Sequence, residues 1–242
     1  MIKVQHVSKT YGKKQNAFQA LDDINFTIPD GASVAILGKS GSGKSTLMHA
    51  MSGLDRPEAG EVLVDDVDIL KLKAREVDTF RARKIGFIFQ SFFVQANETV
   101  YDNVSLPLEI AGVPRKDRRA KIEAALEAVD LSEKIKSKAK NLSGGQKQRL
   151  AIARAIVNEP AIIFADEPTG NLDSVTGERI EKLLFGYNRD NNATLVIVTH
   201  DEDLSRRCDI VIRIKDGVVE SIEEDGAAKS DREEQRKKGE EE

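Results

Sequence analysis

The chain of 242 residues carries a net charge of −4, and 40% of its residues are hydrophobic and 32% charged, which is typical of one globular domain with a highly charged surface. Two complete catalytic domains would not fit into this length, and no block of basic residues indicates a dedicated nucleic-acid binder. The single cysteine excludes an intrachain disulfide and a cysteine-rich metal site. The sequence has neither an apolar signal-peptide core nor a run of about eighteen apolar residues, so we expect any work at a membrane to be done from the cytoplasmic side.

The first quarter of the chain contains short strand patterns at residues 2–7, 21–28 and 61–64. Turn signals separate them, among them Asp30-Gly31. Short strands that follow one another through turns favour antiparallel pairing. We therefore predict a small antiparallel β subdomain at the N-terminus.

Continuously apolar runs then recur along the chain, as is typical of strands that are buried on both faces of a parallel sheet. They lie at residues 34–37, 85–89, 161–165 and 195–198. Between them, apolar residues share one helical face within 122–129 and within 176–187. This alternation predicts an α/β core.

The stretch of about 91–158, rich in Ala, Lys, Glu and Arg, reads as a helical subdomain inserted between two core strands. Near the end, residues 210–214 and 218–222 flank Asp216-Gly217, which is a strong hairpin signal. From residue 223 to 242 the chain is almost entirely charged or polar, which predicts a disordered tail after a domain that spans 1–222.

A phosphate-binding loop follows the predicted strand 34–37. Residues 38–46 read Gly-Lys-Ser-Gly-Ser-Gly-Lys-Ser-Thr, which satisfies the P-loop pattern in the strand-then-helix context that the pattern requires. The glycines let successive backbone amides converge on phosphate oxygens, Lys44 supplies a fixed cation for the β- and γ-phosphates, and the Ser45 hydroxyl is a Mg²⁺ ligand. The residues predicted to bind nucleotide here are Gly38, Ser40, Gly41, Gly43, Lys44, Ser45 and Thr46. A Gly-Ser-rich loop that binds nothing is the alternative, and the loop alone indicates only a nucleoside triphosphate.

Two adjacent carboxylates, Asp166 and Glu167, end the predicted strand 161–165, and ligands of open α/β sheets bind at the carboxyl ends of strands. Asp166 is then placed to hold Mg²⁺, usually through water. Glu167 would face the γ-phosphate, where a carboxylate orients or deprotonates the attacking water. The alternative for Glu167 is an acidic N-cap of the segment that follows.

Residues 142–146 read Leu-Ser-Gly-Gly-Gln and precede an amphipathic helix that we expect to reach Pro160. Here the sequence resembles the ABC (ATP-binding cassette) ATPase family, which implies a RecA-like P-loop NTPase core. In that family this signature binds the γ-phosphate of the ATP held by the partner subunit, so the resemblance implies a homodimer that forms on ATP binding, with Ser143, Gly145 and Gln146 contacting nucleotide. The local physics agrees, because Ser143 is a good N-cap and the helix dipole favours phosphate. A capped helix without a ligand is the alternative.

Further residues match the family in the expected order along the chain. The resemblance makes Gln90 the Q-loop glutamine that senses Mg²⁺ and the catalytic water, and it makes Asp173, at the end of Asn-Leu-Asp, part of the D-loop at the dimer interface. His200 corresponds to the switch histidine at the γ-phosphate, although a lone histidine is usually structural. Tyr11 corresponds to the aromatic that stacks on adenine, and an ordinary strand-edge tyrosine is the alternative.

Segments 101–108 and 166–174 look like the MacB, LolD and FtsE branch of the family, whose members serve exporters, lipoprotein release and cell-wall remodelling. The resemblance implies ATP hydrolysis with Mg²⁺, an integral-membrane permease of the MacB/FtsX type as partner, and a place on the cytoplasmic face of the membrane, with no nucleic acid expected. Segment 91–97, Ser-Phe-Phe-Val-Gln-Ala-Asn, departs from the Leu- and Pro-containing version of this branch. A soluble ABC protein acting on nucleic acid or ribosomes would carry two cassettes or a coiled-coil insertion, and a small-molecule kinase would not explain residues 142–146.

Phe92 and Phe93 come directly after Gln90-Ser91, near the groove where a permease helix docks in related proteins. Two adjacent side chains of an extended segment point to opposite sides, which predicts that at least one ring is free for a partner. Burial of both rings in the core is the alternative.

Overall fold

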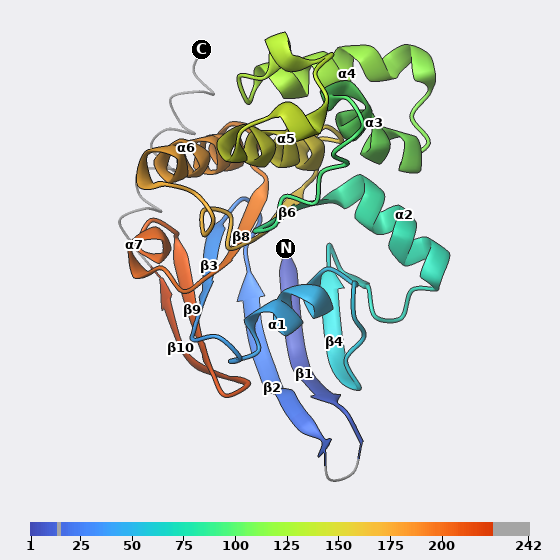
Figure 1. Cartoon of the computed structure of the whole chain (residues 1–242). Helices are drawn as coiled ribbons and strands as arrows, with labels where there is room; N and C mark the ends of the chain where they lie inside the picture. Colours follow the sequence, from blue (N-terminus) through green and yellow to red (C-terminus); the bar gives the residue numbers. More distant parts are fainter. Residues whose placement is uncertain (14–15, 225–242) are drawn as a thin grey trace, which may run out of the picture.

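The computed structural model describes residues 1–13 and 16–224 (Figure 1). Its strands are β1 (Ile2–Tyr11), β2 (Phe18–Ile28), β3 (Ser33–Leu37), β4 (Ala59–Val64), β5 (Val67–Asp68), β6 (Ile85–Phe89), β7 (Ile162–Asp166), β8 (Thr194–Thr199), β9 (Ile210–Lys215) and β10 (Val218–Glu224). Its helices are α1 (Lys44–Met51), α2 (Ala74–Lys84), α3 (Val100–Ile110), α4 (Arg115–Glu127), α5 (Gly144–Ile156), α6 (Ser174–Asn191) and α7 (Glu202–Ser205), with 3-10 turns η2 (Ser132–Lys134) and η3 (Ala139–Asn141).

A six-stranded sheet forms the centre of the molecule, with the strand order β10-β9-β3-β8-β7-β6. All neighbours pair in parallel except β9 and β10, which form the predicted antiparallel hairpin. Every residue of β3 and of β8 is buried, because both faces of these strands are covered. Val34 and Ile36 enter one hydrophobic cluster, whereas Ala35 and Leu37 enter the other, as the side-chain alternation of a strand requires. The predicted α/β core with a mostly parallel sheet is confirmed.

The N-terminal strands form a separate antiparallel sheet with the order β2-β1-β4-β5. Its inner face packs with α1 against the central sheet, and Leu47, Met48 and Met51 of that helix are fully buried there. The predicted antiparallel subdomain is therefore present, and β1 and β2 both extend further toward their connecting turn than the apolar pattern indicated.

Helices α3, α4 and α5 lie together between β6 and β7 in the chain and cover the other face of the central sheet (Figure 1). Leu108, Leu126 and Leu150, one from each helix, belong to the cluster that this face of the sheet completes. Helix α4 ends at Glu127, so Val129 lies beyond the helix that its spacing predicted, but it remains buried in the same cluster. The inserted helical subdomain of the predicted fold is confirmed.

Strand β10 runs to Glu224, two residues past the predicted end of the domain, because Glu223 and Glu224 pair with β9. The rest of the predicted tail, 225–242, lies outside the described residues. Within the described ranges, no helix has both the length and the apolar content needed to span a bilayer.

Candidate functional site

The parallel strands β3, β6, β7 and β8 end at one edge of the central sheet, and the segments that follow them surround a cavity of about 730 Å³. The edge is where open α/β sheets bind ligands, since each strand delivers its next residues to the same place. The cavity is lined by Tyr11, Phe18, Ala20, Lys39, Ser40, Gly41, Gly43, Lys44, Ser45, Thr46, Gln90, Asp166, Glu167 and His200.

The P-loop wraps around the side chain of Lys44, which is only 8% exposed. Its ammonium group donates to the carbonyl oxygens of Gly38 and Lys39 at 2.8 and 2.9 Å, so the loop is closed around its own cation. Helix α1 starts at Lys44, directly after Gly43 in the left-handed conformation with φ of 102°. The first amides of this helix and the Lys44 charge therefore converge on the cavity, which is an arrangement that binds phosphate.

Two glycines of the loop leave no room for a side chain. A Cβ at Gly38 would collide with the carbonyl oxygen of Ile214 on β9, and one at Gly43 would collide with the carbonyl oxygen of Ala20 on β2. Gly38 itself does not line this cavity but a neighbouring one, together with Ile214. The loop is thus held by close backbone approach to both sheets.

Asp166 ends β7 and lines the cavity together with Ser45. Burial raises the pKa of Asp166 above its usual value, and the charge of Glu167 adds to the shift, whereas His49, Lys44 and Ser45 oppose it. A carboxylate and a hydroxyl that line the same cavity fit a hard divalent cation, which prefers oxygen ligands. Among the described residues no group of three or more His, Cys, Asp or Glu could hold a metal ion. Mg²⁺ suits such a sparse protein set, because it is usually bound through few protein oxygens together with phosphate and water.

Glu167 adopts a left-handed backbone conformation with φ of 46°, which is uncommon for a residue other than glycine. Its amide donates to the Val198 carbonyl at 2.9 Å, which fixes it against β8. One carboxylate oxygen lies 2.7 Å from Nδ1 of His200, and the other accepts from the Thr199 hydroxyl at 3.2 Å. The next helix, α6, is capped by Asp173, so the alternative that made Glu167 an N-cap is wrong.

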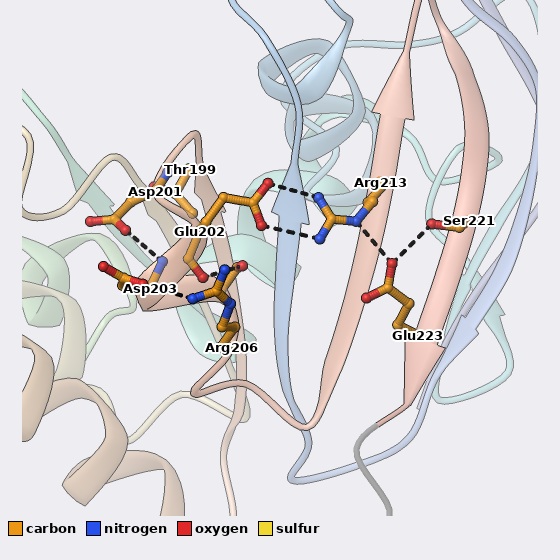
Figure 2. A network of polar contacts seen from close by, with 9 residues as sticks. Thr199, Asp201, Glu202, Asp203, Arg206, Arg213, Ser221 and Glu223 are labelled. Atoms are coloured by element: carbon orange, nitrogen blue, oxygen red, sulfur yellow. Dashed lines mark hydrogen bonds and ion pairs between the residues drawn. The ribbon is translucent and has the colours of Figure 1, made fainter.

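His200 sits on a turn that a charged network fastens to the β9–β10 hairpin. Figure 2 shows the guanidinium of Arg213 on β9 between two carboxylates, Glu202 of α7 and Glu223 of β10. It donates to both oxygens of Glu202 at 2.9 and 3.1 Å and to Glu223 at 2.9 Å. On the other side of the turn, the Asp201 amide donates to the Thr199 hydroxyl at 3.0 Å. The polar contacts thus run from the C-terminal hairpin to Thr199, whose hydroxyl donates to Glu167.

Gln90 lines the cavity from the end of β6, and Asn171 holds its backbone from the neighbouring loop. The side-chain amide of Asn171 donates to the backbone carbonyl of Gln90 at 2.9 Å, and the side-chain amide of Gln90 donates to the Asn171 side-chain oxygen at 3.4 Å. Gly170 approaches the same side chain so closely that a Cβ there would meet the Gln90 amide nitrogen at 2.9 Å.

Tyr11 lines the cavity, and its side chain is 41% exposed. Its hydroxyl donates to Asp55 at 2.7 Å, and the Lys9 ammonium lies 5.1 Å from the ring centroid. Phe18, which pairs with Tyr11 across β1 and β2, lies beside it and is 58% exposed. An aromatic surface that is fixed at its edge but open to solvent suits stacking with a planar ring.

The predicted residues of the signature and the D-loop do not line the cavity. Ser143 caps α5 in a reciprocal pair with Gln146: the Gln146 amide donates to the Ser143 hydroxyl at 3.3 Å, and the Ser143 amide donates to the Gln146 side chain at 3.0 Å. Asp173 accepts from Thr176 at 3.0 Å and 2.7 Å, and Thr176 in turn packs on Gly145. These residues form a neighbouring group on the surface, apart from the cavity of the same chain.

Sequence reasoning missed Phe18, Ala20 and Lys39 as lining residues of the cavity. Lys39 lies within the P-loop pattern, which leaves its second position open. Phe18 stands in a polar stretch just beyond a predicted strand, and only the β1–β2 register brings it next to Tyr11.

The segment after Gln90 is not extended, so the argument that placed Phe92 and Phe93 on opposite sides of a strand is wrong. Both residues have positive φ, 53° and 47°. Phe93 is 64% exposed and packs edge-on against Phe89 at 5.3 Å, whereas Phe92 is partly buried. Burial of both rings in the core is therefore excluded.

Comparisons with known proteins agree with this geometry. The profile of the ABC transporter family matches residues 21–170. The lipoprotein-releasing system ATP-binding protein LolD of Syntrophus aciditrophicus is 41% identical over 90% of this chain and 98% of its own length. The cell division ATP-binding protein FtsE of Escherichia coli K12 is 44% identical over 90% of this chain and 96% of its own.

Among solved structures, the ATP-binding cassette MJ0796 of Methanocaldococcus jannaschii, determined as a post-hydrolysis dimer bound to ADP and Pi, superposes with a TM-score of 0.85. It is 41% identical, and the match covers 93% of this chain and 98% of that one. The predicted relation to LolD and FtsE is thereby confirmed. The chain belongs to the ABC transporter family as an ATP-hydrolysing, ATP-binding cassette of the branch that contains these two proteins.

Proposed function

We propose that this chain binds ATP with Mg²⁺ as a homodimer and uses ATP hydrolysis to drive a separate integral-membrane permease of the MacB/FtsX type. One observation carries the site assignment: the P-loop, Gln90, Asp166, Glu167 and His200, which are far apart in the sequence, line one cavity at the edge of the parallel sheet. Each of these groups has its own part in binding or hydrolysing ATP.

The nucleotide lies along the cavity, with adenine on the face of Tyr11 and the phosphates at the P-loop. Lys44 and the α1 N-terminus neutralise the β- and γ-phosphates, since backbone amides and a buried ammonium point into this end. The cavity residues Ser40, Gly41, Gly43 and Thr46 supply the rest of the phosphate contacts. Gly38 supports them through its carbonyl oxygen, which accepts from the Lys44 ammonium.

Ser45, Asp166 and the amide oxygen of Gln90 would hold Mg²⁺, which when bound neutralises charge on the phosphate oxygens. The raised pKa of Asp166 is consistent with a carboxylate whose positive partner arrives with the substrate. Gln90 is set by Asn171, so its amide stays close to the γ-phosphate end of the cavity.

Glu167 is the general base that takes a proton from the attacking water. His200 and Thr199 each hold one of its oxygens, so the carboxylate keeps one orientation as the water approaches. A base positioned in this way typically contributes about 10²–10⁴-fold to a rate. His200 is mostly exposed, which leaves its other ring nitrogen free to contact the γ-phosphate.

A second copy of the chain completes the site. Ser143, Gly145 and Gln146 lie at a helix N-terminus outside the cavity of their own chain, and α5 is long enough for its dipole to favour an anion. We propose that this N-terminus binds the γ-phosphate in the partner, with Asp173 alongside it at the interface. The solved structure of MJ0796 is a dimer bound to ADP and Pi, which supports this arrangement.

The relatives support the proposed partner class. LolD belongs to a lipoprotein-releasing system and FtsE is a cell division protein, and we propose that this chain acts beneath a permease, at the cytoplasmic face of the membrane. The competing class, a soluble ABC protein on nucleic acid or ribosomes, is disfavoured by the net charge of −4 and the single P-loop.

Affinity purification of the tagged chain from detergent-solubilised membranes tests the partner class. An integral-membrane protein should co-purify in stoichiometric amount, and Mg-ATP should change how much is retained. Recovery of ribosomes or nucleic acid, abolished by nuclease treatment, would instead support the competing class.

A further inference from the structure

Arg154 is a residue of α5 that lies outside the ATP cavity. Its guanidinium donates to the carbonyl oxygen of Phe93 at 2.6 Å and to that of Phe92 at 2.9 Å. These contacts join the helix of the signature to the segment that follows Gln90, across 61 and 62 positions of the chain.

The segment that Arg154 contacts has an unfavourable backbone. Phe92 and Phe93 are consecutive left-handed residues, and bulky side chains rarely adopt that conformation. The Phe93 amide also folds back to the Ser91 carbonyl at 2.5 Å, which makes a three-residue turn of the strained kind. Such residues cost on the order of 1–3 kcal/mol each and persist only where neighbouring groups hold them. Two parallel hydrogen bonds from a guanidinium are suited to this, because its donors form a rigid fork.

Arg154 serves no other partner among the residues that the structure describes. It forms no ion pair there, and burial alone lowers the pKa of its guanidinium. A partly buried cation without a carboxylate is costly unless it is hydrogen-bonded, and here the Phe92 and Phe93 carbonyls accept from its two terminal nitrogens. Later in the same segment the backbone of η3 holds the chain, because the Lys140 amide donates to the Ala96 carbonyl at 2.8 Å. Arg154 therefore fixes the part of the segment that lies nearest to Gln90.

We propose that Arg154 is a positioning residue for ATP hydrolysis: it holds the Phe92–Phe93 turn and thereby sets the side chain of Gln90 in the cavity. Asn171 fixes the Gln90 carbonyl from one side, and Arg154 fixes the chain two residues later from the other. Because α5 begins at the signature, the same contact ties the Gln90 segment of one ATP site to the helix that serves the other site. The inference rests on the proposed function, which gives Gln90 its part in hydrolysis.

Arg149 on the same helix offers a matched control. It donates to two consecutive carbonyls of another loop, Val129 at 2.9 Å and Asp130 at 3.0 Å, and Asp130 is also left-handed. That loop lies in the helical subdomain and does not reach the ATP cavity. Replacing either arginine by methionine removes hydrogen bonds to two consecutive carbonyls while keeping the aliphatic stem, and at Arg149 it also removes an ion pair with the Asp130 carboxylate at 3.8 Å.

The test is a double-mutant cycle on the full chain, with kcat and KM for ATP measured for Arg154→Met, Gln90→Ala, the double variant and Arg149→Met. Arg154→Met should lower kcat about tenfold or more with KM nearly unchanged, since a misplacement of about 1 Å can cost about 10²-fold. If Arg154 acts through Gln90, the kcat of the double variant should lie within about twofold of the kcat of Gln90→Ala alone. Arg149→Met should keep the kcat of the wild type.

Other outcomes would overturn the inference. An unchanged kcat in Arg154→Met, together with a low kcat in Gln90→Ala, would exclude the positioning role of Arg154 but leave the role of Gln90. The same conclusion would follow if the losses of kcat multiplied in the double variant, or if both arginine variants lost kcat equally. Unchanged kcat in Gln90→Ala would remove the proposed part of Gln90 and the inference with it. If Arg154→Met does not fold, Arg154→Lys replaces it in the double-mutant cycle. A lysine lacks the fork, so its kcat should still fall.

Discussion

Nδ1 of His200 lies 2.7 Å from Oε1 of Glu167, so the histidine that follows β8 and the carboxylate that follows β7 form one unit. The left-handed backbone of Glu167 turns its side chain toward β8 at the point where the next residues leave the sheet. The contact lets His200, 33 positions away in the sequence, orient the carboxylate that acts on the water in the proposed mechanism. It also predicts what happens when the carboxylate loses its charge.

Glu167→Gln should keep ATP binding and lower turnover by about 10²–10⁴-fold, because the amide has the same shape but cannot accept a proton. Steady-state phosphate release measures the rate, and a fluorescent ATP analogue measures binding. With hydrolysis blocked, closed dimers should persist, so size-exclusion chromatography with Mg-ATP should show more dimer than in the wild type. Phosphate release within about threefold of the wild type would remove Glu167 from the role of base.

Ser143→Arg should abolish hydrolysis while leaving nucleotide affinity of the single chain intact, because Ser143 lies outside the cavity of its own chain. A Lys44→Ala chain has the opposite defect. A mixture of the two should regain activity, since each heterodimer contains one site with both residues unchanged. Heterodimers that form but remain inactive would show that Ser143 does not act across the interface in this way, or that both sites must hydrolyse together.

The fold and most of the cavity could be predicted because their signals are local. The P-loop is one uninterrupted pattern, and the apolar runs before Gln90, Asp166 and His200 predict parallel strands whose ends meet at one edge. Knowing that edge is enough to bring these residues together. Ser143 was recognisable for the same reason, because a cap and its helix are neighbours in the sequence.

Contacts between distant side chains could not be predicted in this way. Nothing near Arg154 in the sequence indicates that its guanidinium meets carbonyls some 60 positions earlier. The left-handed conformations of Glu167, Phe92 and Phe93 were equally hidden, since none is a residue type that favours them. In each case the surrounding tertiary contacts decide the backbone, against its local preference.

Phe93→Ala should weaken permease binding by about 1–3 kcal/mol, the usual cost of removing an aromatic anchor from an interface. The structure narrows the prediction from either phenylalanine to Phe93, because only its ring is largely exposed, at 64%. A membrane pull-down measures recruitment, and Ile110→Ala, which removes an equally exposed apolar side chain at the end of α3, serves as control. Basal ATPase activity and melting temperature should remain near the wild type. Undiminished recruitment of the Phe93 variant would exclude an anchor at this position.

Asp55→Asn should raise KM for ATP and lower stability in a pH-dependent way. Burial by itself would raise the pKa of Asp55, but hydrogen bonds from Tyr11 and Lys9 outweigh it and hold the pKa below its usual value. A carboxyl whose pKa is lower in the folded chain stabilises the fold above its unfolded pKa of about 4, and this contribution is lost as the pH falls through the folded value. The melting temperature of the variant should therefore lie below that of the wild type at pH 7 and approach it under acid conditions.

Tyr11→Phe separates the two effects of that change, because it keeps the ring at the cavity but loses the 2.7 Å hydrogen bond to Asp55. If Asp55 acts on ATP by orienting the ring, Tyr11→Phe should raise KM about as much as Asp55→Asn does, whereas Tyr11→Ala should raise it further by removing the stacking surface, worth roughly 1–3 kcal/mol for a base. The Lys9 contacts to Asp55 and Glu58 remain in Tyr11→Phe, so its pH profile of stability should stay closer to that of the wild type. A normal KM in both Tyr11 variants would show that adenine does not rest on this ring, and the pH profile of Asp55→Asn would then report only on the fold.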